Sequence, residues 1–119
     1  MNSDALGRQG EEQACDYLRA RGVKVLQTRY RVADGEIDII AQDGAVLCFI
    51  EVKHRPQGRL GEGLQSVSPQ KRQRMHRAAQ QYLHGHPHPP KWRFDTLEIT
   101  RAGIWYATAA AQPLQRDMT

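Results

Sequence analysis

The chain of 119 residues, 39% of them hydrophobic and 25% charged, has the size and composition of one soluble domain and excludes a disordered chain. No apolar stretch approaches the ~20 residues that span a bilayer, and the first residues lack the basic and apolar regions of a secretion signal. The net charge is a modest +4. With Cys15 and Cys48 as the two cysteines, no disulfide framework is implied, and we expect a cytoplasmic protein without a membrane partner.

The first two elements are predicted to be a helix and a strand. An apolar stripe of Ala14, Cys15 and Leu18 predicts a helix over about 4–21, and Gly22 supplies its end. The segment 23–32 is rich in β-branched and aromatic residues, which predicts a strand with Val23, Val25 and Gln27 on one face.

A hairpin is predicted next. Strands over about 35–41 and 45–54 are joined at Asp43-Gly44, a strong hairpin signal. Glycine and proline then mark 55–67 as a flexible loop.

A second helix and two closing strands complete the chain. Ser68 is the expected N-cap of the helix, Pro69 its first residue, and Gly85 lies past its end. Its buried face is expected to carry five residues: Met75, Ala78, Ala79, Tyr82 and Leu83. Strands over 92–100 and 103–109 follow, and 112–119 is expected to be a frayed tail. The order α-β-β-β-α-β-β predicts a single α+β domain, 1–119, with helices packed on a sheet.

The predicted hairpin carries charges where half-buried strands usually carry apolar residues. With the turn at Asp43-Gly44, facing residues sum to 87, so Asp38 lies opposite Phe49 and diagonal to Glu51. Side chains at 36, 38, 51 and 53 then share one face, and Ile37, Ile39, Ile50 and Val52 share the other. Asp38 and Glu51 are then close enough for their carboxylates to share a cation, with Cβ atoms at most ~7–8 Å apart.

Such a pair of carboxylates suits Mg²⁺ or Mn²⁺, because hard cations prefer oxygen ligands and relieve the repulsion between the two charges. Lys53 lies two residues beyond Glu51 and adds a positive charge, which suits metal-assisted hydrolysis of a phosphodiester. Its ammonium group would orient or deprotonate a water, or stabilise charge on the phosphate. The alternative interpretation of the same residues is a solvated hairpin face with alternating charges.

Several blocks of the sequence, in order, resemble a known bacterial family, the YraN-type family. The matching blocks are GRQGEEQACDYL (7–18), RYRVADGEIDIIAQDG (29–44), FIEVKHR (49–55), SPQKRQRMHRAAQQYL (68–83) and RFD (93–95). This family is similar to archaeal Holliday-junction resolvases within the restriction-endonuclease-like PD-(D/E)XK superfamily. The resemblance implies an αβββαβ core with a mixed sheet.

The resemblance also implies roles for individual residues. Asp38 and Glu51 match the metal ligands of the superfamily, and Lys53 matches its catalytic lysine. Glu11 matches an acidic residue on the first helix of the resolvases. The superfamily has a proline before the first acid, where this chain has Ile37, and Glu36 is an additional acid. Glu36 is either a supporting partner of the site or a structural charge stabilised by Arg29 or Arg31.

The segment from Lys53 to Arg93 carries nine Lys or Arg residues and one acid, Glu62, which indicates a positive surface suited to phosphates. The candidate nucleic-acid-binding residues are Arg55, Arg59, Lys71, Arg74 and Arg77. Phosphate contacts of this kind position a duplex without reading its bases. The alternative is an ordinary solvated basic surface.

Two further polar features are interpreted as structural. Asp95 is expected to be a structural polar residue, and the H-x-H-x-H of His84, His86 and His88 is not expected to form a zinc site, which needs four convergent ligands. Cys48 is expected to be an inert buried thiol.

Three functions follow from the sequence. The first is a Mg²⁺- or Mn²⁺-dependent endonuclease that acts on DNA, including branched or recombination intermediates, with no small-molecule cofactor. The second is a non-catalytic nucleic-acid-binding module that retains the nuclease fold. The third is an adaptor whose basic face binds an acidic protein. A homodimer is expected if two strands are cut symmetrically.

Overall fold

The computed structural model describes residues 3–55, 68–86, 88 and 90–108, with side chains from residue 7 onward. The elements follow the predicted order: α1 (Ser3–Ala20), β1 (Lys24–Val32), β2 (Gly35–Asp43), β3 (Val46–His54), α2 (Pro69–Leu83), β4 (Lys91–Thr100) and β5 (Gly103–Thr108). Nearly all of the predicted loop 55–67, and the predicted tail 112–119, lie outside the described residues. Neither described helix is long and apolar enough to cross a bilayer.

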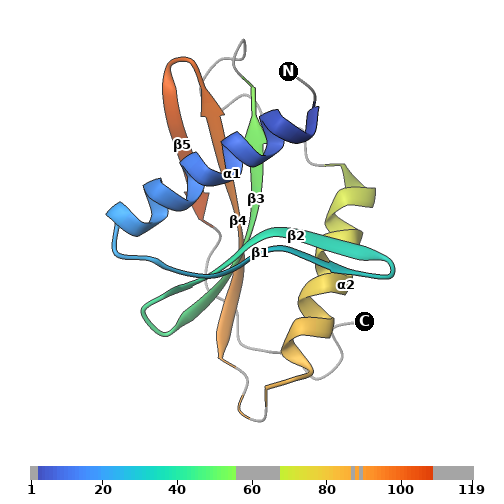
Figure 1. Cartoon of the computed structure of the whole chain (residues 1–119). Helices are drawn as coiled ribbons and strands as arrows, with labels where there is room; N and C mark the ends of the chain where they lie inside the picture. The colour runs from blue at the N-terminus through green and yellow to red at the C-terminus, as the bar shows by residue number, and fades with distance from the viewer. Residues whose placement is uncertain (1–2, 56–67, 87, 89, 109–119) are drawn as a thin grey trace.

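The five strands form one mixed sheet in the order β1-β2-β3-β4-β5. β3 and β4 are parallel, and the other neighbouring pairs are antiparallel. A parallel pair needs a long crossover connection, and α2 lies within the one between β3 and β4. The two helices pack on opposite faces of the sheet (Figure 1). The predicted α+β fold with a mixed sheet is confirmed.

Each helix covers its own hydrophobic cluster. The cluster beneath α1 contains Ala14, Cys15, Leu18, Val23, Ile39, Ala41, Cys48, Ile50, Leu97 and Ile99. The cluster beneath α2 contains Ile37, Ile40, Leu47, Phe49, Ala78, Ala79, Leu83 and Trp92. Because β2 and β3 contribute to both clusters, the central strands are held from both sides, and side chains projecting from them are positioned by a packed core.

Local sequence signals set the helix ends as predicted. Gly22 has a φ of +82°, and the N–H groups of Gly22 and Val23 donate to the carbonyls of Arg19 and Leu18, which is a Schellman motif. At the start of α2, the Ser68 Oγ accepts a hydrogen bond of 3.1 Å from the backbone N–H of Lys71.

The register of the central hairpin differs from the prediction. Asp43 pairs with Val46 and Ile40 with Phe49, so facing residues sum to 89, and the turn is Gly44-Ala45. Gly44 has a φ of +59° and is the first turn residue, as in a type II′ turn. The sequence prediction placed the turn one residue too early. A shift of two in the sum preserves the side on which each residue of the ladder projects; the paired residues run from Ile39–Ile50 to Asp43–Val46 and do not include Asp38.

A second correction concerns the alternation of side chains on β1 and β2. Ile37 packs beneath α2, whereas Ile39 packs beneath α1, so these two residues do not share a face. Arg29 has a φ of +53° and lies between the pairs Thr28–Ile39 and Tyr30–Ile37. The regular alternation of side chains between the two faces of the sheet is interrupted at this point. A bulge between Val25 and Gln27 also moves Gln27 out of the alternation that joined it to Val25.

Gly35, the first residue of β2, allows the hairpin to approach α2. A Cβ at this position would lie 2.3 Å from the Arg74 carbonyl oxygen and 2.9 Å from the Ala78 nitrogen. We therefore expect Gly35→Ala to lower the free energy of unfolding by about 2 kcal/mol, since neither backbone atom can move freely. Chemical denaturation measures the change. Gly85→Ala is the control, because its Cβ would meet only the Tyr82 oxygen at 3.7 Å, and an equal loss in both variants would contradict the explanation.

Candidate functional site

A carboxylate–lysine cluster, consisting of Asp38, Glu51 and Lys53, lies on the two central strands. Asp38 leaves the regular ladder: its Oδ2 accepts a hydrogen bond of 2.8 Å from the backbone N–H of Val52. Glu51 projects from the neighbouring strand and is buried, with 4% of its surface exposed. The Nζ of Lys53 lies 3.3 Å from the Glu51 Oε1. Two acids and one ammonium group that are two to fifteen residues apart in the sequence are thus brought together by the hairpin.

One oxygen of this cluster is unsatisfied. Within the described residues, the buried Oε2 of Glu51 has no hydrogen-bond partner. A buried carboxylate oxygen in this state is costly unless a donor or a cation compensates it. Carboxylate oxygens such as those of Asp38 and Glu51 are the ligands that hard divalent cations prefer. Asp38 and Glu51 therefore fit a site for Mg²⁺ or Mn²⁺.

The environment of Asp38 makes its carboxyl group harder to ionise than that of an exposed aspartate. Burial raises the pKa of Asp38, and the hydrogen bond from Val52 and the ammonium group of Lys71 only partly oppose this effect. A cation bound to this carboxylate would therefore displace a proton over part of the acidic range.

A rim of basic side chains lies beside Asp38 and converges on Glu36. The Lys71 Nζ lies 3.0 Å from the Glu36 Oε1, and the Arg74 guanidinium lies 3.6 Å from the same oxygen. Arg31 lies 3.9 Å from the other carboxylate oxygen. The hydrogen bond from Lys71 holds the pKa of Glu36 below its ordinary value. Lys71 and Arg74, predicted as nucleic-acid-binding residues, are thus brought next to the carboxylate–lysine cluster, and Glu36 has Arg31 as one of its partners.

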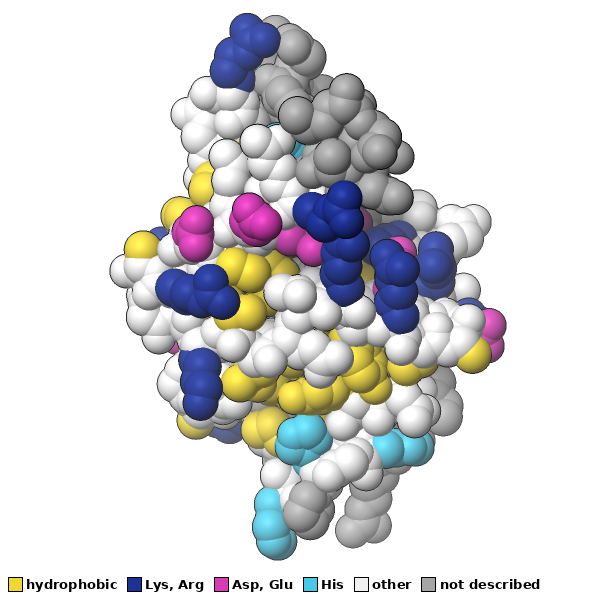
Figure 2. All heavy atoms as spheres, viewed as in Figure 1, with side chains coloured by type: hydrophobic (Ala, Val, Ile, Leu, Met, Phe, Trp, Pro, Cys, Tyr) yellow, Lys and Arg dark blue, Asp and Glu magenta, His cyan; other side chains and the backbone are white. Residues whose placement is uncertain are grey.

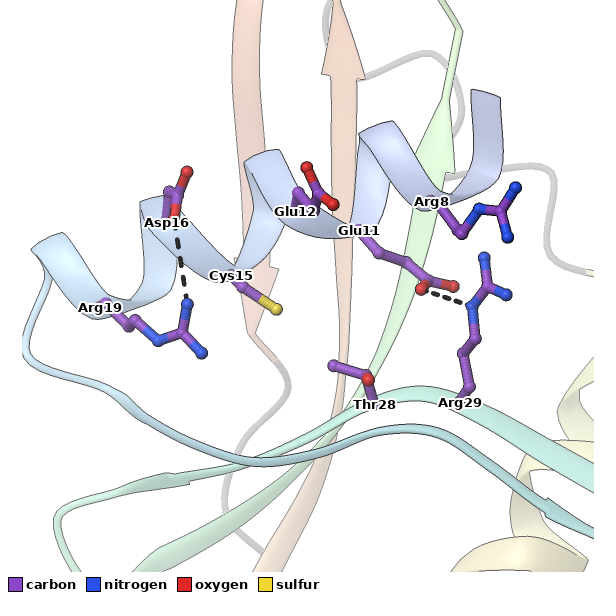
Figure 3. A pocket seen from close by; sticks show the side chains of 8 residues that line it. All are labelled: Arg8, Glu11, Glu12, Cys15, Asp16, Arg19, Thr28 and Arg29. Atoms are coloured by element: carbon purple, nitrogen blue, oxygen red, sulfur yellow. Dashed lines mark hydrogen bonds and ion pairs between the residues drawn. The ribbon is translucent and has the colours of Figure 1, made fainter. Parts of the chain in front are cut away.

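Glu11 occupies a different setting. Its Oε2 lies 2.7 Å from the Nε of Arg29, and both residues line a groove of about 530 Å³ between α1 and β1 (Figure 3). Among the described residues, no three His, Cys, Asp or Glu side chains are arranged to hold a metal ion. Glu11 therefore does not join Asp38 and Glu51 as a third ligand in this structure. The role in catalysis that the resemblance implies for Glu11 stays a prediction.

The remaining candidate nucleic-acid-binding residues are spread over three segments. Arg77 is exposed on α2, one turn beyond Arg74. Arg55 is partly buried after β3, where its backbone N–H donates to the Ile99 carbonyl at 2.8 Å. Arg59 lies outside the described residues. Of this predicted set, Lys71 and Arg74 are shown in contact with a carboxylate, that of Glu36.

One buried acid beside the carboxylate–lysine cluster was not among the residues predicted from the sequence. Glu98 on β4 is fully buried, and it is the residue that pairs with Lys53 in the parallel ladder. Its even spacing from Trp92 and Phe94 along the strand indicated that it projects from the same face of the sheet as they do. However, the parallel register that places it beside Lys53 depends on the crossover through α2, and no local signal in the sequence defines that register.

Asp95 and Cys48 lie in buried positions where their contacts are with neighbouring residues of the protein. Asp95 is buried, accepts hydrogen bonds of 3.0 Å from the Arg93 Nε on both oxygens, and accepts a further bond from the Tyr106 hydroxyl. These contacts agree with its expected structural role. Burial raises the pKa of the Cys48 thiol to about 12, which agrees with an inert thiol.

Fold and site together define a mixed-sheet α/β sandwich domain with two carboxylates and a lysine on its central hairpin. The model of the family described as "Uncharacterised protein family UPF0102" matches residues 10–99, and the chain belongs to this family. A UPF0102 protein of Chlorobium phaeobacteroides is 47% identical over 95 residues, which cover 79% of this chain and 75% of the relative. One from Nitrosococcus oceani is 44% identical, covering 79% and 77%, and one from Frankia alni is 42% identical, covering 85% of each.

Proposed function

We propose that the protein is a metal-dependent endonuclease that acts on DNA, with branched and recombination intermediates among its substrates. One observation carries the proposal: Asp38, Glu51 and Lys53 share one level of the central hairpin, and the buried Glu51 Oε2 has no partner among the described residues. The resemblance to PD-(D/E)XK nucleases supports the same interpretation.

Asp38 and Glu51 would hold Mg²⁺ or Mn²⁺, which when bound supplies Lewis-acid activation of a phosphodiester and of a water molecule. Val52 fixes the orientation of the Asp38 carboxylate through its N–H group. Lys53 has 23% of its side chain exposed and lies beside Glu51, so its ammonium group is placed to stabilise negative charge on a phosphate at the site.

DNA is the proposed partner because basic side chains adjoin the cluster on the same side as α2. Lys71 and Arg74 lie near Asp38 and Glu36, and Arg77 extends the basic surface along the helix. Charges of this kind contact phosphates without reading bases, so the proposed recognition depends on the shape of the DNA. For junction substrates the proposal includes a two-fold dimer, because symmetrical cutting of two strands needs two sites.

The pairing of Glu11 with Arg29 favours one alternative, a nucleic-acid-binding module without nuclease activity. In that case the acid that the resemblance assigns to catalysis would serve to hold α1 against β1. The module would still bind DNA through its basic surface.

The test is incubation of the purified protein with junction, flap, nicked and linear DNA, with Mg²⁺, Mn²⁺ or EDTA. We expect cleavage of at least one substrate with a divalent cation, no cleavage in EDTA, and loss of cleavage in Asp38→Ala. Asp34→Ala, which removes an exposed acid from the turn of the same sheet ribbon, should keep the activity. Binding without cleavage under every condition would favour the binding module, and cleavage retained by Asp38→Ala would contradict the proposed site.

A further inference from the structure

Three cationic side chains from two elements surround a single carboxylate beside the proposed site. Arg31 belongs to β1, Lys71 and Arg74 belong to α2, and all three lie within 3.9 Å of an oxygen of Glu36. The group of four, which we term the Glu36 cluster, carries a net charge of +2. One carboxylate therefore holds three like charges in place without neutralising them.

The Glu36 cluster is accessible from solvent. The side chains of Arg31 and Arg74 are 69% and 52% exposed, and that of Glu36 is 26% exposed. Dark-blue Lys and Arg side chains lie side by side on the face between α1 and the tip of the β1–β2 ribbon (Figure 2). Because the side chains of Arg31 and Arg74 are more exposed than that of Glu36, an anion approaching the Glu36 cluster would meet the arginines before it reached the carboxylate.

The Glu36 cluster also adjoins the carboxylate–lysine cluster. Glu36 lies two residues before Asp38 on β2, and Lys71 acts on both carboxylates electrostatically. Carboxylate and phosphate oxygens accept the same charge-assisted hydrogen bonds from guanidinium and ammonium groups. The carboxylate of Glu36 thus occupies hydrogen-bond donors that a phosphate could also use.

We propose that Glu36 occupies a phosphate-binding subsite, preorganising Arg31, Lys71 and Arg74 and competing with a backbone phosphate of DNA for them. This inference rests on the proposed function in taking DNA as the partner, and it adds the subsite and the intramolecular competitor. Glu36 keeps the three cations close together in the free protein, and the DNA phosphate takes over their hydrogen bonds on binding. The expected consequence is that Glu36 weakens DNA binding, although it lies within the binding surface.

The test is the affinity for a duplex and a four-way junction, measured by fluorescence anisotropy in EDTA at several salt concentrations. Glu36→Gln should bind about tenfold more tightly, because the released cations make new phosphate contacts, and its salt dependence should steepen by about one unit of slope. Arg31→Ala should bind more weakly, with a slope about one unit shallower. Glu12→Gln on α1 is the matched control: it changes the net charge equally, and its affinity should stay near that of the wild type.

The outcomes separate the inference from the proposed function. If the wild-type protein binds none of these DNAs at any salt concentration, the proposed function fails. If the wild type binds but Glu36→Gln binds equally or more weakly, the subsite is overturned while the DNA partner stands. Should Glu36→Gln fail to fold, Arg31→Ala alone decides, since its exposed side chain contributes little to packing, and an unchanged salt slope in that variant overturns the subsite.

Discussion

Saturating Mg²⁺ or Mn²⁺ should raise the midpoint of thermal unfolding of the wild-type protein, and Glu51→Gln should abolish the rise. A ligand that binds only the folded state at about 100 times its Kd stabilises by about 2.7 kcal/mol, which corresponds to about 10 °C for a domain of this size. Glu51→Gln keeps the shape of the side chain but removes the charge of a buried carboxylate whose Oε2 has no partner among the described residues.

The size of this metal effect should depend on pH in a defined direction. Burial raises the pKa of Asp38 above its ordinary value of 3.8. Between the ordinary pKa of the unfolded state and the raised pKa of the folded state, the folded protein binds more protons than the unfolded chain. The metal-free protein therefore loses stability from this group as the pH rises through that range. Above the raised pKa the carboxylate is ionised and ready for the cation. The metal-induced rise should therefore be largest near neutral pH and shrink as the pH falls through the pKa of folded Asp38.

Differential scanning fluorimetry or calorimetry measures both effects. Glu12→Gln should retain the full rise, because Glu12 is exposed on α1, away from the central hairpin. An equal rise in the wild type and in Glu51→Gln would place the cation elsewhere on the protein. No rise in the wild type at any pH between 6 and 8, where carboxylates are normally ionised (pKa about 4), would contradict the metal site.

The second large effect is expected for Lys53, which should act on the reaction and not on cation binding. Lys53→Met removes the ammonium group 3.3 Å from the Glu51 Oε1 and leaves both carboxylates in place. Loss of one positioned group that stabilises developing charge lowers a rate by about 10²- to 10³-fold. We therefore expect that loss in the single-turnover cleavage rate, together with a metal-induced rise in the unfolding temperature that is at least as large as in the wild type.

Lys91→Met is the control for this experiment, because Lys91 is exposed at the start of β4 and its loss changes the net charge equally. Its cleavage rate should stay near that of the wild type. If Lys53→Met cleaves at the wild-type rate, Lys53 serves only as a structural partner of Glu51. If it loses both cleavage and the metal-induced rise, the variant has disturbed the carboxylates, and the division of roles between them and Lys53 is wrong.

Element order and the location of the site were predictable because their signals are local. Ser68-Pro69 and Gly22 mark helix ends through hydrogen bonds made within a few residues. The hairpin was predictable for the same reason, although its turn is Gly44-Ala45 and not Asp43-Gly44. That error moved no residue of the paired ladder to the other face of the sheet, because both turns have two residues and the register moved by an even number.

The rest of the site depends on interactions that no local pattern reveals. The positive φ of Arg29 is unusual for this residue type. The break in alternation that places Ile37 and Ile39 on opposite faces of the sheet therefore had no signal in the sequence. The position of Glu98 beside Lys53 follows from a parallel register set by tertiary packing. Likewise, the pairing of Glu11 with Arg29 depends on how α1 crosses β1, which helical periodicity does not define.

The central claim is that Asp38 and Glu51 together bind a divalent cation. The most direct measurement is an anomalous difference map from a crystal soaked in Mn²⁺. We expect one peak bonded to an oxygen of each carboxylate at about 2.0–2.3 Å, with Lys53 alongside but not bonded to it. A peak held by other side chains, or carboxylates that point away from each other with no peak between them, would show that Asp38 and Glu51 do not form a cation site.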